Sequence, residues 1–470
     1  MNQPDHFTAP YDSGPRKSTL KRRLLGAARW TLAGHFIAQA LRLCSNLILT
    51  RMLAPDLFGV MSVGYMVFTG LWMLSDLGLF AVVARSHRGD EPKFLNVVWI
   101  AQMMRGALIT LGALTLSGAA AYVAKTTPFL AHSVYGDARI PGVIAVLSLY
   151  GILSAFESTK TLWARRNLSF AALTKVELAS QIGTTTIILG WAVIDPSIWA
   201  LVGGFLLGTA LRTVLSHLAL PGPTNRLEWD ASAFREIIDF GKWALVSSPI
   251  SFLLTSGDRL SLGVFLDATT MGFYSVATLL IAALQTVVGK IVGEAVLPAL
   301  GEVIRSRPGE LKATAYRIRR PLDIACIIPA GALFMLGDLI VRILYDSRYE
   351  PAGWMLSVLA LTLATTQFAV FDQCLIALGK MRLLSALNLV RLIALYSLIP
   401  LFYWIWGVRG AIIAVPASAL VNTGILLCIQ AKLKLLDFKR ELFALPLLAS
   451  GLLAGWLLDL LLRQVLPLAR

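Results

Sequence analysis

Apolar residues gather into thirteen segments of similar length, separated by short polar connections. A helix rises about 1.5 Å per residue and the hydrocarbon core of a bilayer is about 30 Å thick, so apolar segments of roughly 18 to 25 residues predict transmembrane helices. The predicted helices are 24–50, 57–84, 94–118, 140–163, 170–193, 197–218, 241–265, 271–299, 322–344, 353–377, 383–405, 408–431 and 443–462. The last has no counterpart in a scheme of six plus six, and it is either a thirteenth spanning helix or an interfacial segment.

The first segment has one polar face. Its polar residues are Thr31, His35, Gln39, Arg42, Asn46 and Thr50, at steps of four, four, three, four and four. At about 3.6 residues per turn, this spacing puts them in a single stripe along a helix. An unpaired arginine near mid-span costs roughly 2.5 to 3.5 kcal/mol on insertion scales. The stripe therefore predicts that this helix lines a cavity or a helix contact.

The same stretch recurs later in the chain, and the two copies align without a gap. The informative pairs are Trp30 with Trp243, Gly59 with Gly272, Ser62 with Ser275 and Val63 with Val276. We therefore predict two homologous lobes, 24–219 and 241–431. Because six helices return the chain to the side on which it started, the lobes should be parallel repeats related by an axis along the membrane normal.

Basic residues are concentrated in every second connection. These connections are 16–23, 85–93, 160–166, 212–242, 305–320, 380–382 and 432–440. The positive-inside rule places them, and the N-terminus, in the cytoplasm. The remaining parts are then a cytoplasmic tail (1–23), a connector that begins with a helix-breaking Pro-Gly-Pro (220–240) and a C-terminal extension that carries the thirteenth segment (432–470).

The composition narrows the class of protein. With 57% hydrophobic and 15% charged residues, against about 25% charged in ordinary domains, the chain is predicted to be an all-α polytopic membrane protein. The net charge of +15 lies in the basic connections, so we expect no nucleic-acid partner. Four cysteines inside apolar segments, Cys44, Cys326, Cys374 and Cys428, are expected to be packing residues. We propose no metal site and no cofactor.

No catalytic constellation is present in the sequence. It has neither a Gly-x-Ser-x-Gly nucleophile motif nor a Gly-x-x-x-x-Gly-Lys-Ser/Thr phosphate loop. A membrane polymerase or ligase would need catalytic residues in a large outer loop, and the longest such loop, 122–139, holds one His, one Asp and one Arg. We expect no enzyme and name no catalytic residue.

Several short motifs resemble those of a known family. They are Leu53-Ala54-Pro55-Asp56-Leu57-Phe58-Gly59, Ser75-Asp76-Leu77-Gly78-Leu79, Asp258-Arg259-Leu260-Ser261-Leu262-Gly263-Val264-Phe265-Leu266 and Met271-Gly272-Phe273-Tyr274-Ser275. With them, residues 24–431 resemble the bacterial polysaccharide (O-antigen and exopolysaccharide) flippases of the multidrug/oligosaccharidyl-lipid/polysaccharide exporter superfamily. The resemblance implies two six-helix lobes forming a V around a central cavity. It also implies alternating access driven by an ion gradient or the membrane potential.

The implied substrate carries a diphosphate, which fixed cations in a wet cavity can hold. The candidate substrate-binding residues are Arg42, Arg105, Lys290 and Arg391 at mid-span, with His35, Gln39, Asn46 and Arg259. Two of these cations have a simpler interpretation, because Lys290 could pair with Glu294 and Arg105 with Asp76.

Four carboxylates are candidates for coupling transport to a proton: Asp76, Glu157, Asp258 and Asp372. A coupling carboxylate needs a pKa raised by burial. Asp258, directly before Arg259, favours a structural contact between the lobes instead. Arg212, near the end of its segment, is expected to be an interfacial anchor.

These observations predict a flippase of undecaprenyl-diphosphate-linked repeat units in the bacterial inner membrane. Its partners would be that lipid-linked oligosaccharide, membrane lipid, and polysaccharide polymerase or export machinery. The alternatives are a cation-coupled multidrug exporter of the same superfamily and a flippase for a peptidoglycan lipid precursor. Fixed cations oppose the first alternative, because they would repel cationic drugs.

Overall fold

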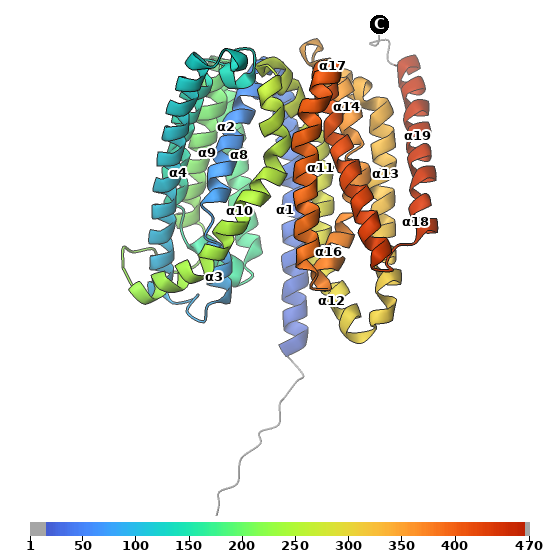
Figure 1. The fold of residues 1–470 in the computed structure, drawn as a ribbon. Helices are drawn as coiled ribbons and strands as arrows, with labels where there is room; N and C mark the ends of the chain where they lie inside the picture. The colour runs from blue at the N-terminus through green and yellow to red at the C-terminus, as the bar shows by residue number, and fades with distance from the viewer. Residues whose placement is uncertain (1–15, 466–470) are drawn as a thin grey trace, which may run out of the picture.

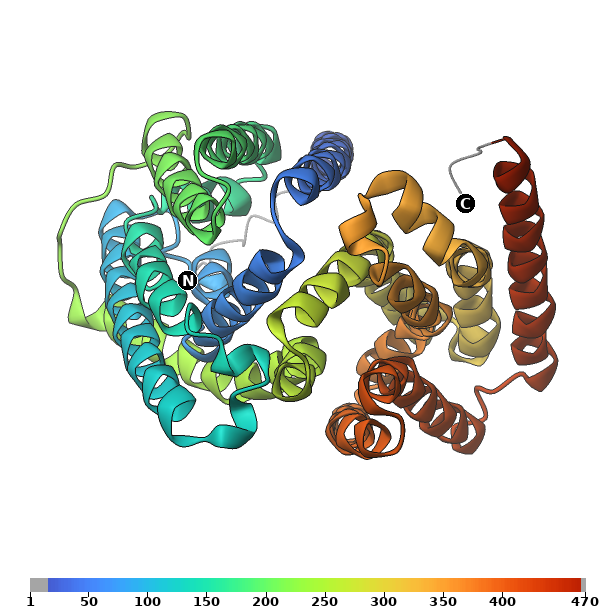
Figure 2. The ribbon, with the colours of Figure 1, turned by 90° about the horizontal axis from the view of Figure 1, so that it is seen from above.

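The structure is a computed structural model that describes residues 16–465. Only the backbone is described for residues 16–32 and at 243, 244, 246, 247, 294, 295, 308, 463 and 465. Every regular element in the described part is a helix. The helices form two groups that stand side by side, with α19 at the outer edge of the second group (Figures 1 and 2).

The N-terminal lobe begins with one long helix and continues with several broken ones. Its elements are α1 (Arg16–Met52), α2 (Pro55–Leu74), α3 (Leu79–Arg85), α4 (Pro92–Thr126), η1 (Pro128–Leu130), η2 (Val134–Gly136), α5 (Ile140–Leu147), α6 (Leu149–Ala155), α7 (Lys160–Arg166), α8 (Phe170–Ile194) and α9 (Ile198–Leu218).

The C-terminal lobe repeats this order. Its elements are α10 (Ala231–Phe265), α11 (Ala268–Ile291), the π-helix η3 (Val292–Val296), α12 (Leu297–Ser306), η4 (Pro308–Glu310), α13 (Leu311–Leu344), η5 (Ser347–Tyr349), α14 (Ala352–Ala360), α15 (Leu363–Thr366), α16 (Ala369–Ala377) and α17 (Met381–Lys432). It is followed by α18 (Phe438–Leu442) and α19 (Ala444–Val465).

All thirteen predicted segments fall on helices, and several helices break where the backbone demands it. Gly78, with φ of 60°, begins α3 after the turn that ends α2. Gly407, with φ of 61° and ψ of −145°, splits α17 into the two predicted spans 383–405 and 408–431. Left-handed or otherwise unusual backbone of this kind costs glycine little and other residues more.

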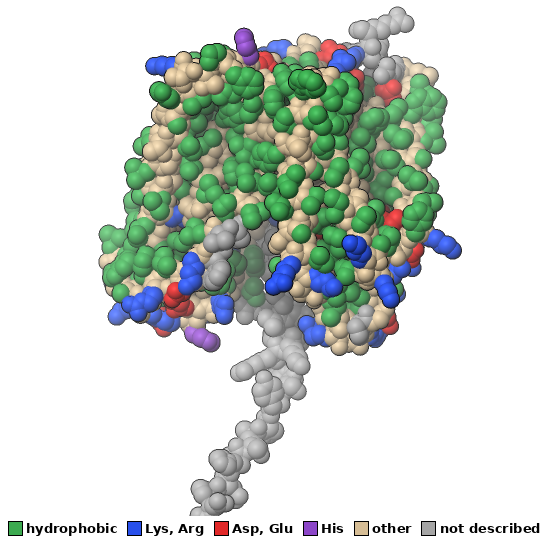
Figure 3. Space-filling model, in the orientation of Figure 1, with side chains coloured by type: hydrophobic (Ala, Val, Ile, Leu, Met, Phe, Trp, Pro, Cys, Tyr) green, Lys and Arg blue, Asp and Glu red, His purple; other side chains and the backbone are tan. Residues whose placement is uncertain are grey.

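The helices suit a bilayer. Among the described residues, nine helical stretches are long and apolar enough to cross a membrane, and the bent pair Ile140–Ala155 and Lys160–Arg166, at 60°, would make a tenth. The space-filling view shows a broad hydrophobic band, with Lys and Arg gathered mainly along the lower end (Figure 3). The chain is therefore a multi-pass membrane protein.

The C-terminal extension is a helix that docks on the second lobe. A methyl group at Gly451 would lie 2.4 Å from the carbonyl oxygen of Ile328, and one at Gly331 would lie 2.7 Å from that of Leu448. Glycines thus let α13 and α19 approach backbone to backbone, as small residues do between membrane helices. Below this contact, Glu441 pairs with Arg319 at 2.6 Å.

The lobes meet at the upper end of Figure 1, through reciprocal contacts. The backbone N–H of Val134 in η2 donates to the carbonyl of Leu266, the residue after α10, at 2.7 Å. The hydroxyl of Tyr349 in η5 donates to the carbonyl of Leu53, which lies just beyond α1, at 3.0 Å. Because Leu53 and Leu266 are counterparts in the sequence repeat, each lobe uses its short helix to bind the same point of the other.

Helix α10 crosses the predicted boundary at residue 240 without a break. Its first turns belong with the N-terminal lobe, because Ala233 and Ile237 are buried against Leu79 and Phe94. The second lobe therefore begins inside a helix.

Two cysteines depart from the expectation of packing residues. Cys326 and Cys374 are buried, but Cys44 and Cys428 lie exposed on the surface of their helices. In a bilayer-embedded helix an apolar thiol needs no protein partner.

Candidate functional site

A cavity of about 540 Å³ lies in the N-terminal lobe, where Lys290 of the C-terminal lobe reaches its wall. Its charged and titratable lining residues are His35 and Arg42 of α1, Arg165 of α7, Glu177 of α8, Arg212 of α9 and Lys290 of α11. We call it the cation cavity. Four permanent cations and Glu177 line it, and Glu157 lies beside it as the partner of Arg212, so the local net charge is +2 and suits an anionic ligand.

The polar stripe of α1 lines a cavity in one part and makes contacts with other helices in another, the two roles that its pattern predicts. His35 and Arg42, two turns apart, line the cation cavity. Further along the same helix, the Asn46 side-chain oxygen accepts from the hydroxyl of Tyr345 at 3.4 Å, and the Thr50 carbonyl accepts from Arg348. Gln39, between His35 and Arg42, is buried. His35 and Arg42 thus face the cavity, whereas Asn46 contacts the other lobe through its side chain and Thr50 through its backbone carbonyl. The side chain of Thr31 lies outside the described residues.

Arg212 was expected to be an interfacial anchor, and that interpretation is wrong. Its guanidinium lies in the cation cavity and pairs with Glu157 at 3.3 Å. Arg165, which was not among the residues predicted from the sequence, also lines the cation cavity, and its guanidinium lies 3.8 Å from the Glu177 carboxylate. The available signal was Glu177 itself, a carboxylate inside a predicted apolar span.

Arg105 lies away from the cation cavity, inside the N-terminal lobe. Its guanidinium is 4.1 Å from the ring centre of Trp72, donates to the carbonyl of that residue at 2.6 Å and pairs with Asp76 at 3.4 Å. These are the contacts of the simpler interpretation. Lys290 lines the cavity, whereas the side chain of its predicted partner Glu294 lies outside the described residues.

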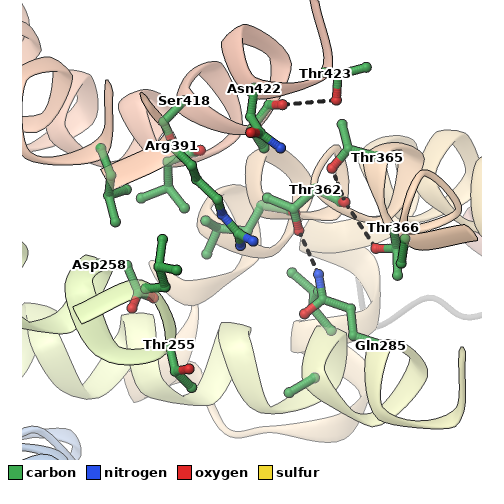
Figure 4. Close-up of a pocket in the computed structure, with 18 of the residues that line it drawn as sticks. Thr255, Asp258, Gln285, Thr362, Thr365, Thr366, Arg391, Ser418, Asn422 and Thr423 are labelled. Atoms are coloured by element: carbon green, nitrogen blue, oxygen red, sulfur yellow. Dashed lines mark hydrogen bonds between the residues drawn. The ribbon is translucent and has the colours of Figure 1, made fainter. Parts of the chain in front are cut away.

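A second cavity of about 520 Å³ lies within the C-terminal lobe. We call it the C-lobe pocket. Arg259, Arg391, Asp258 and Asp372 line it together with a ring of threonines and amides. Figure 4 shows Arg391 extending into the space between α17 and the pair α10 and α11. Two of the candidate cations therefore lie in this pocket and two in the cation cavity.

The four candidate coupling carboxylates have different surroundings. Asp76 and Glu157 are paired with arginines. Asp258 accepts a hydrogen bond from the Tyr274 hydroxyl within its own lobe, so the expected contact between lobes is wrong. In the described part of the chain, Asp372 stands apart, because its Oδ1 is buried and has no hydrogen-bond partner.

Helix α11 joins the two cavities. Gln285 lines the C-lobe pocket and Lys290 lines the cation cavity. Five residues of helix span roughly 7 to 8 Å along the axis. At about 100° per residue the two side chains also point roughly 140° apart, so the two cavities lie on different faces of α11.

Comparison with known proteins decides the family. A family profile described as "Polysaccharide biosynthesis protein" matches residues 48–353. The chain belongs to this polysaccharide biosynthesis protein family. The profile begins within the polar stripe of α1 and ends at the start of α14, so the family region includes Lys290 and Arg212.

Two curated proteins are similar in sequence over much of the chain. The lipopolysaccharide biosynthesis protein WzxC of Escherichia coli (strain K12) is 19% identical over 71% of this chain and 65% of its own length. An uncharacterized membrane protein in the cps region of Klebsiella pneumoniae is 22% identical over 86% of this chain and 81% of its own. The chain thus spans less than two thirds of the length of WzxC.

Solved structures share the fold at low sequence identity. The lipid II flippase MurJ in an inward closed conformation matches with a TM-score of 0.70, 12% identity and 92% coverage of both chains. An inward-facing multidrug resistance transporter of the MATE family in the MOP superfamily matches with a TM-score of 0.57, 13% identity and coverage of 84% of this chain and 94% of that one. The described helices therefore have the two-lobed, V-shaped fold that these transporters share.

Proposed function

We propose that this protein is a flippase. It moves polyprenyl-diphosphate-linked oligosaccharide repeat units from the cytoplasmic to the periplasmic leaflet by alternating access, in the synthesis of exopolysaccharide or O-antigen. The single observation behind the proposal is the cation cavity, which draws Arg42 from one lobe and Lys290 from the other. A site shared by both lobes can be exposed to either side as the lobes rock.

A flippase of this kind must carry a diphosphate across hydrocarbon, and the cation cavity offers groups that can bind one. A diphosphate cannot enter hydrocarbon, and arginine offers it a bidentate fork while lysine offers a point charge. The net positive charge of the cation cavity attracts the anion, and the isoprenoid tail stays in lipid. The carrier lipid we propose is undecaprenyl diphosphate, in the bacterial inner membrane, with the N-terminus in the cytoplasm.

The two alternative functions, a multidrug exporter and a peptidoglycan-precursor flippase, are separated from the proposal by different observations. A multidrug exporter for cationic compounds would bring like charges together in the cation cavity. A flippase of a peptidoglycan lipid precursor would use the same phosphate chemistry, so it differs only in the sugar or peptide that follows. Neighbouring genes separate these: glycosyltransferases favour a polysaccharide repeat unit, and cell-wall genes favour the precursor.

We propose no catalytic role for the chain. It supplies a path for its substrate, and ion or potential coupling supplies the energy. A polysaccharide polymerase or export machinery would consume what it delivers.

A leaflet-resolved assay of lipid-linked oligosaccharide in cells lacking the protein tests this proposal. Wild-type protein should restore substrate to the outer leaflet. Arg42→Ala and Lys290→Ala should each restore roughly tenfold less, since a hydrogen bond to a charged group is worth about 1.5 to 3 kcal/mol. Arg409→Ala, an exposed arginine that lines neither cavity, is the matched control. Normal restoration by both cavity variants would count against the phosphate role.

A further inference from the structure

We infer that the C-lobe pocket is a glycan subsite, separate from the cation cavity, that holds the sugar part of the lipid-linked substrate. The inference rests on the proposed function and adds to it a place where the sugar is recognised. The two cavities have similar volumes, about 520 and 540 Å³. They differ in the chemistry of their walls.

The charges of the C-lobe pocket cancel. Asp258 and Asp372 balance Arg259 and Arg391, whereas the cation cavity keeps a surplus of positive charge even with Glu157 beside Arg212. A neutral wall gives no preference for a diphosphate. Carboxylates and guanidinium groups placed side by side do suit hydroxyl groups, because a hydroxyl both donates and accepts.

Uncharged polar groups make up much of the remaining wall. They include Thr255, Gln285, Thr362, Thr366, Ser418 and Asn422, contributed by α10, α11, α15 and α17 and the turn before α15 (Figure 4). Membrane helices also use such groups for contacts with one another, but here the groups line an open volume. A ligand with many hydroxyls needs many of them, at varied angles.

Some buried polar atoms of the pocket lack a partner. In the described part of the chain these include Oδ1 of Asp372, Oδ1 of Asn422 and Nε of Arg259. A buried polar atom without a hydrogen bond costs about 1 to 3 kcal/mol. Two acceptors and one donor, each from a different helix, are thus available to a ligand that brings hydroxyl groups.

A metal ion fits this pocket less well. The described residues contain no group of three or more His, Cys, Asp or Glu side chains arranged to hold one. Arg259 and Arg391 would also repel a cation bound beside Asp258 or Asp372. The volume falls within the ~300 to 1,000 Å³ of pockets that enclose small organic ligands.

The position of the pocket suits a headgroup that spans both cavities. Gln285 in the pocket and Lys290 in the cation cavity lie on the same helix, five residues apart. From a diphosphate held by Arg42 and Lys290, the attached sugars would extend roughly 7 to 8 Å along α11 and around it to the face of Gln285. Gln285 is joined there to Thr362 by a 3.3 Å hydrogen bond. The lipid would thus be recognised in two parts.

The test measures binding of two lipids to the purified full-length protein in nanodiscs. One probe is undecaprenyl diphosphate without sugar, and the other is the undecaprenyl-diphosphate-linked oligosaccharide that accumulates in cells lacking the protein. Asn422→Ala should weaken binding of the sugar-bearing lipid about three- to tenfold, the worth of one hydrogen bond, and leave the sugar-free lipid unchanged. Arg42→Ala should weaken both lipids by a similar factor.

Two further variants keep the test decisive. Thr366→Val, which keeps the shape of the side chain, should reproduce the selective effect if Asn422→Ala folds poorly. Ser397→Ala removes a hydroxyl from α17 that bonds the Ile393 carbonyl and lies outside the pocket, and it should change neither affinity.

The outcomes separate the two proposals. If Asn422→Ala and Thr366→Val change both affinities equally, or neither, the glycan subsite is wrong. The same conclusion follows if they alter only the dependence of transport on sodium or protons. If wild-type protein binds neither lipid, the proposed function itself fails.

Discussion

Gly59 of α2 and Gly272 of α11 lie against each other at the point where the two lobes meet. A methyl group at Gly59 would lie 1.8 Å from the carbonyl oxygen of Ala268, and one at Gly272 would lie 1.9 Å from that of Pro55. In the sequence repeat, Gly272 is the counterpart of Gly59, and Ala268 is the counterpart of Pro55. The repeat therefore exchanges the two halves of this contact, as at a twofold axis, where residue i of one half meets j of the other and j meets i.

This symmetry makes Gly59→Ala a direct perturbation of the lobe contact. The added methyl group meets backbone that cannot rotate away, so α2 and α11 must separate, at a cost of about 1 to 3 kcal/mol or more. We expect spin labels at His87 and Arg382, one on each lobe, to show a changed and broader distance distribution. Gly118→Ala, where a methyl group would meet open space, should leave the distribution unchanged. Identical distributions for both variants would show that the contact is not tight.

A second prediction concerns the contacts that the short helices η2 and η5 make with the opposite lobe. Tyr349→Phe leaves the Leu53 carbonyl without its bond from the other lobe, and a buried unpaired acceptor costs about 1 to 3 kcal/mol. The melting temperature of the purified protein should fall by several degrees. Tyr122→Phe, at a side chain that is 69% exposed, is the control. Equal melting temperatures would contradict a role for Tyr349 in closing this end.

The docking of α18 and α19 on the second lobe depends on the buried guanidinium of Arg319. Arg319 is 1% exposed and lies 4.2 Å from the ring centre of Phe368, with Glu441 and Asp323 as partners. Glu441→Gln should cost about 3 kcal/mol, because removing one partner of a buried pair leaves the other uncompensated. We expect faster proteolysis at residues 433–437, the link to α18. Glu350→Gln breaks an exposed pair with Arg342 and should cost little; equal cleavage of both variants would refute the prediction.

A pH dependence is expected at the start of α10. Hydrogen bonds from Arg88 and Ser232 hold the pKa of Asp230 well below its ordinary value. A carboxylate with a lowered folded pKa stabilises the fold above its ordinary pKa, and this contribution is lost as the pH falls through the folded value. The stability advantage of wild-type protein over Asp230→Asn should therefore be constant near neutral pH and shrink below about pH 4. Thermal unfolding at pH 7, 5 and 3 measures it. An advantage that grows on acidification would have the wrong sign.

Most of the fold could be predicted from the sequence, because bilayer thickness and helical periodicity act locally. Apolar segment length placed the helices, and the Gly59 and Gly272 pair reports a contact that the structure contains. The Trp30 and Trp243 pair, in contrast, falls on side chains outside the described residues. The breaks in the second and fourth spans were missed, since a short interruption leaves mean hydropathy unchanged.

The site was harder to predict than the fold. Arg42, Arg105 and Arg391 look alike in sequence, as single cations in apolar spans, yet they lie in the cation cavity, in the lobe interior and in the C-lobe pocket. Which of these a cation joins depends on helix rotation and on partners far away in the chain, such as Trp72 for Arg105. Periodicity on a single helix carries that information only where several polar residues share a face, as in α1.

The central claim is that the cation cavity, lined by the N-terminal lobe and Lys290 of the other lobe, holds the diphosphate of a lipid that crosses the membrane. The most direct measurement is translocation of undecaprenyl-diphosphate-linked oligosaccharide in liposomes that contain only this protein, comparing wild type with the double variant Arg42→Gln and Lys290→Gln and with Arg409→Gln. We predict that wild type and Arg409→Gln move the lipid at equal rates, and that the double variant is at least tenfold slower. Equal rates for all three proteins would contradict the account.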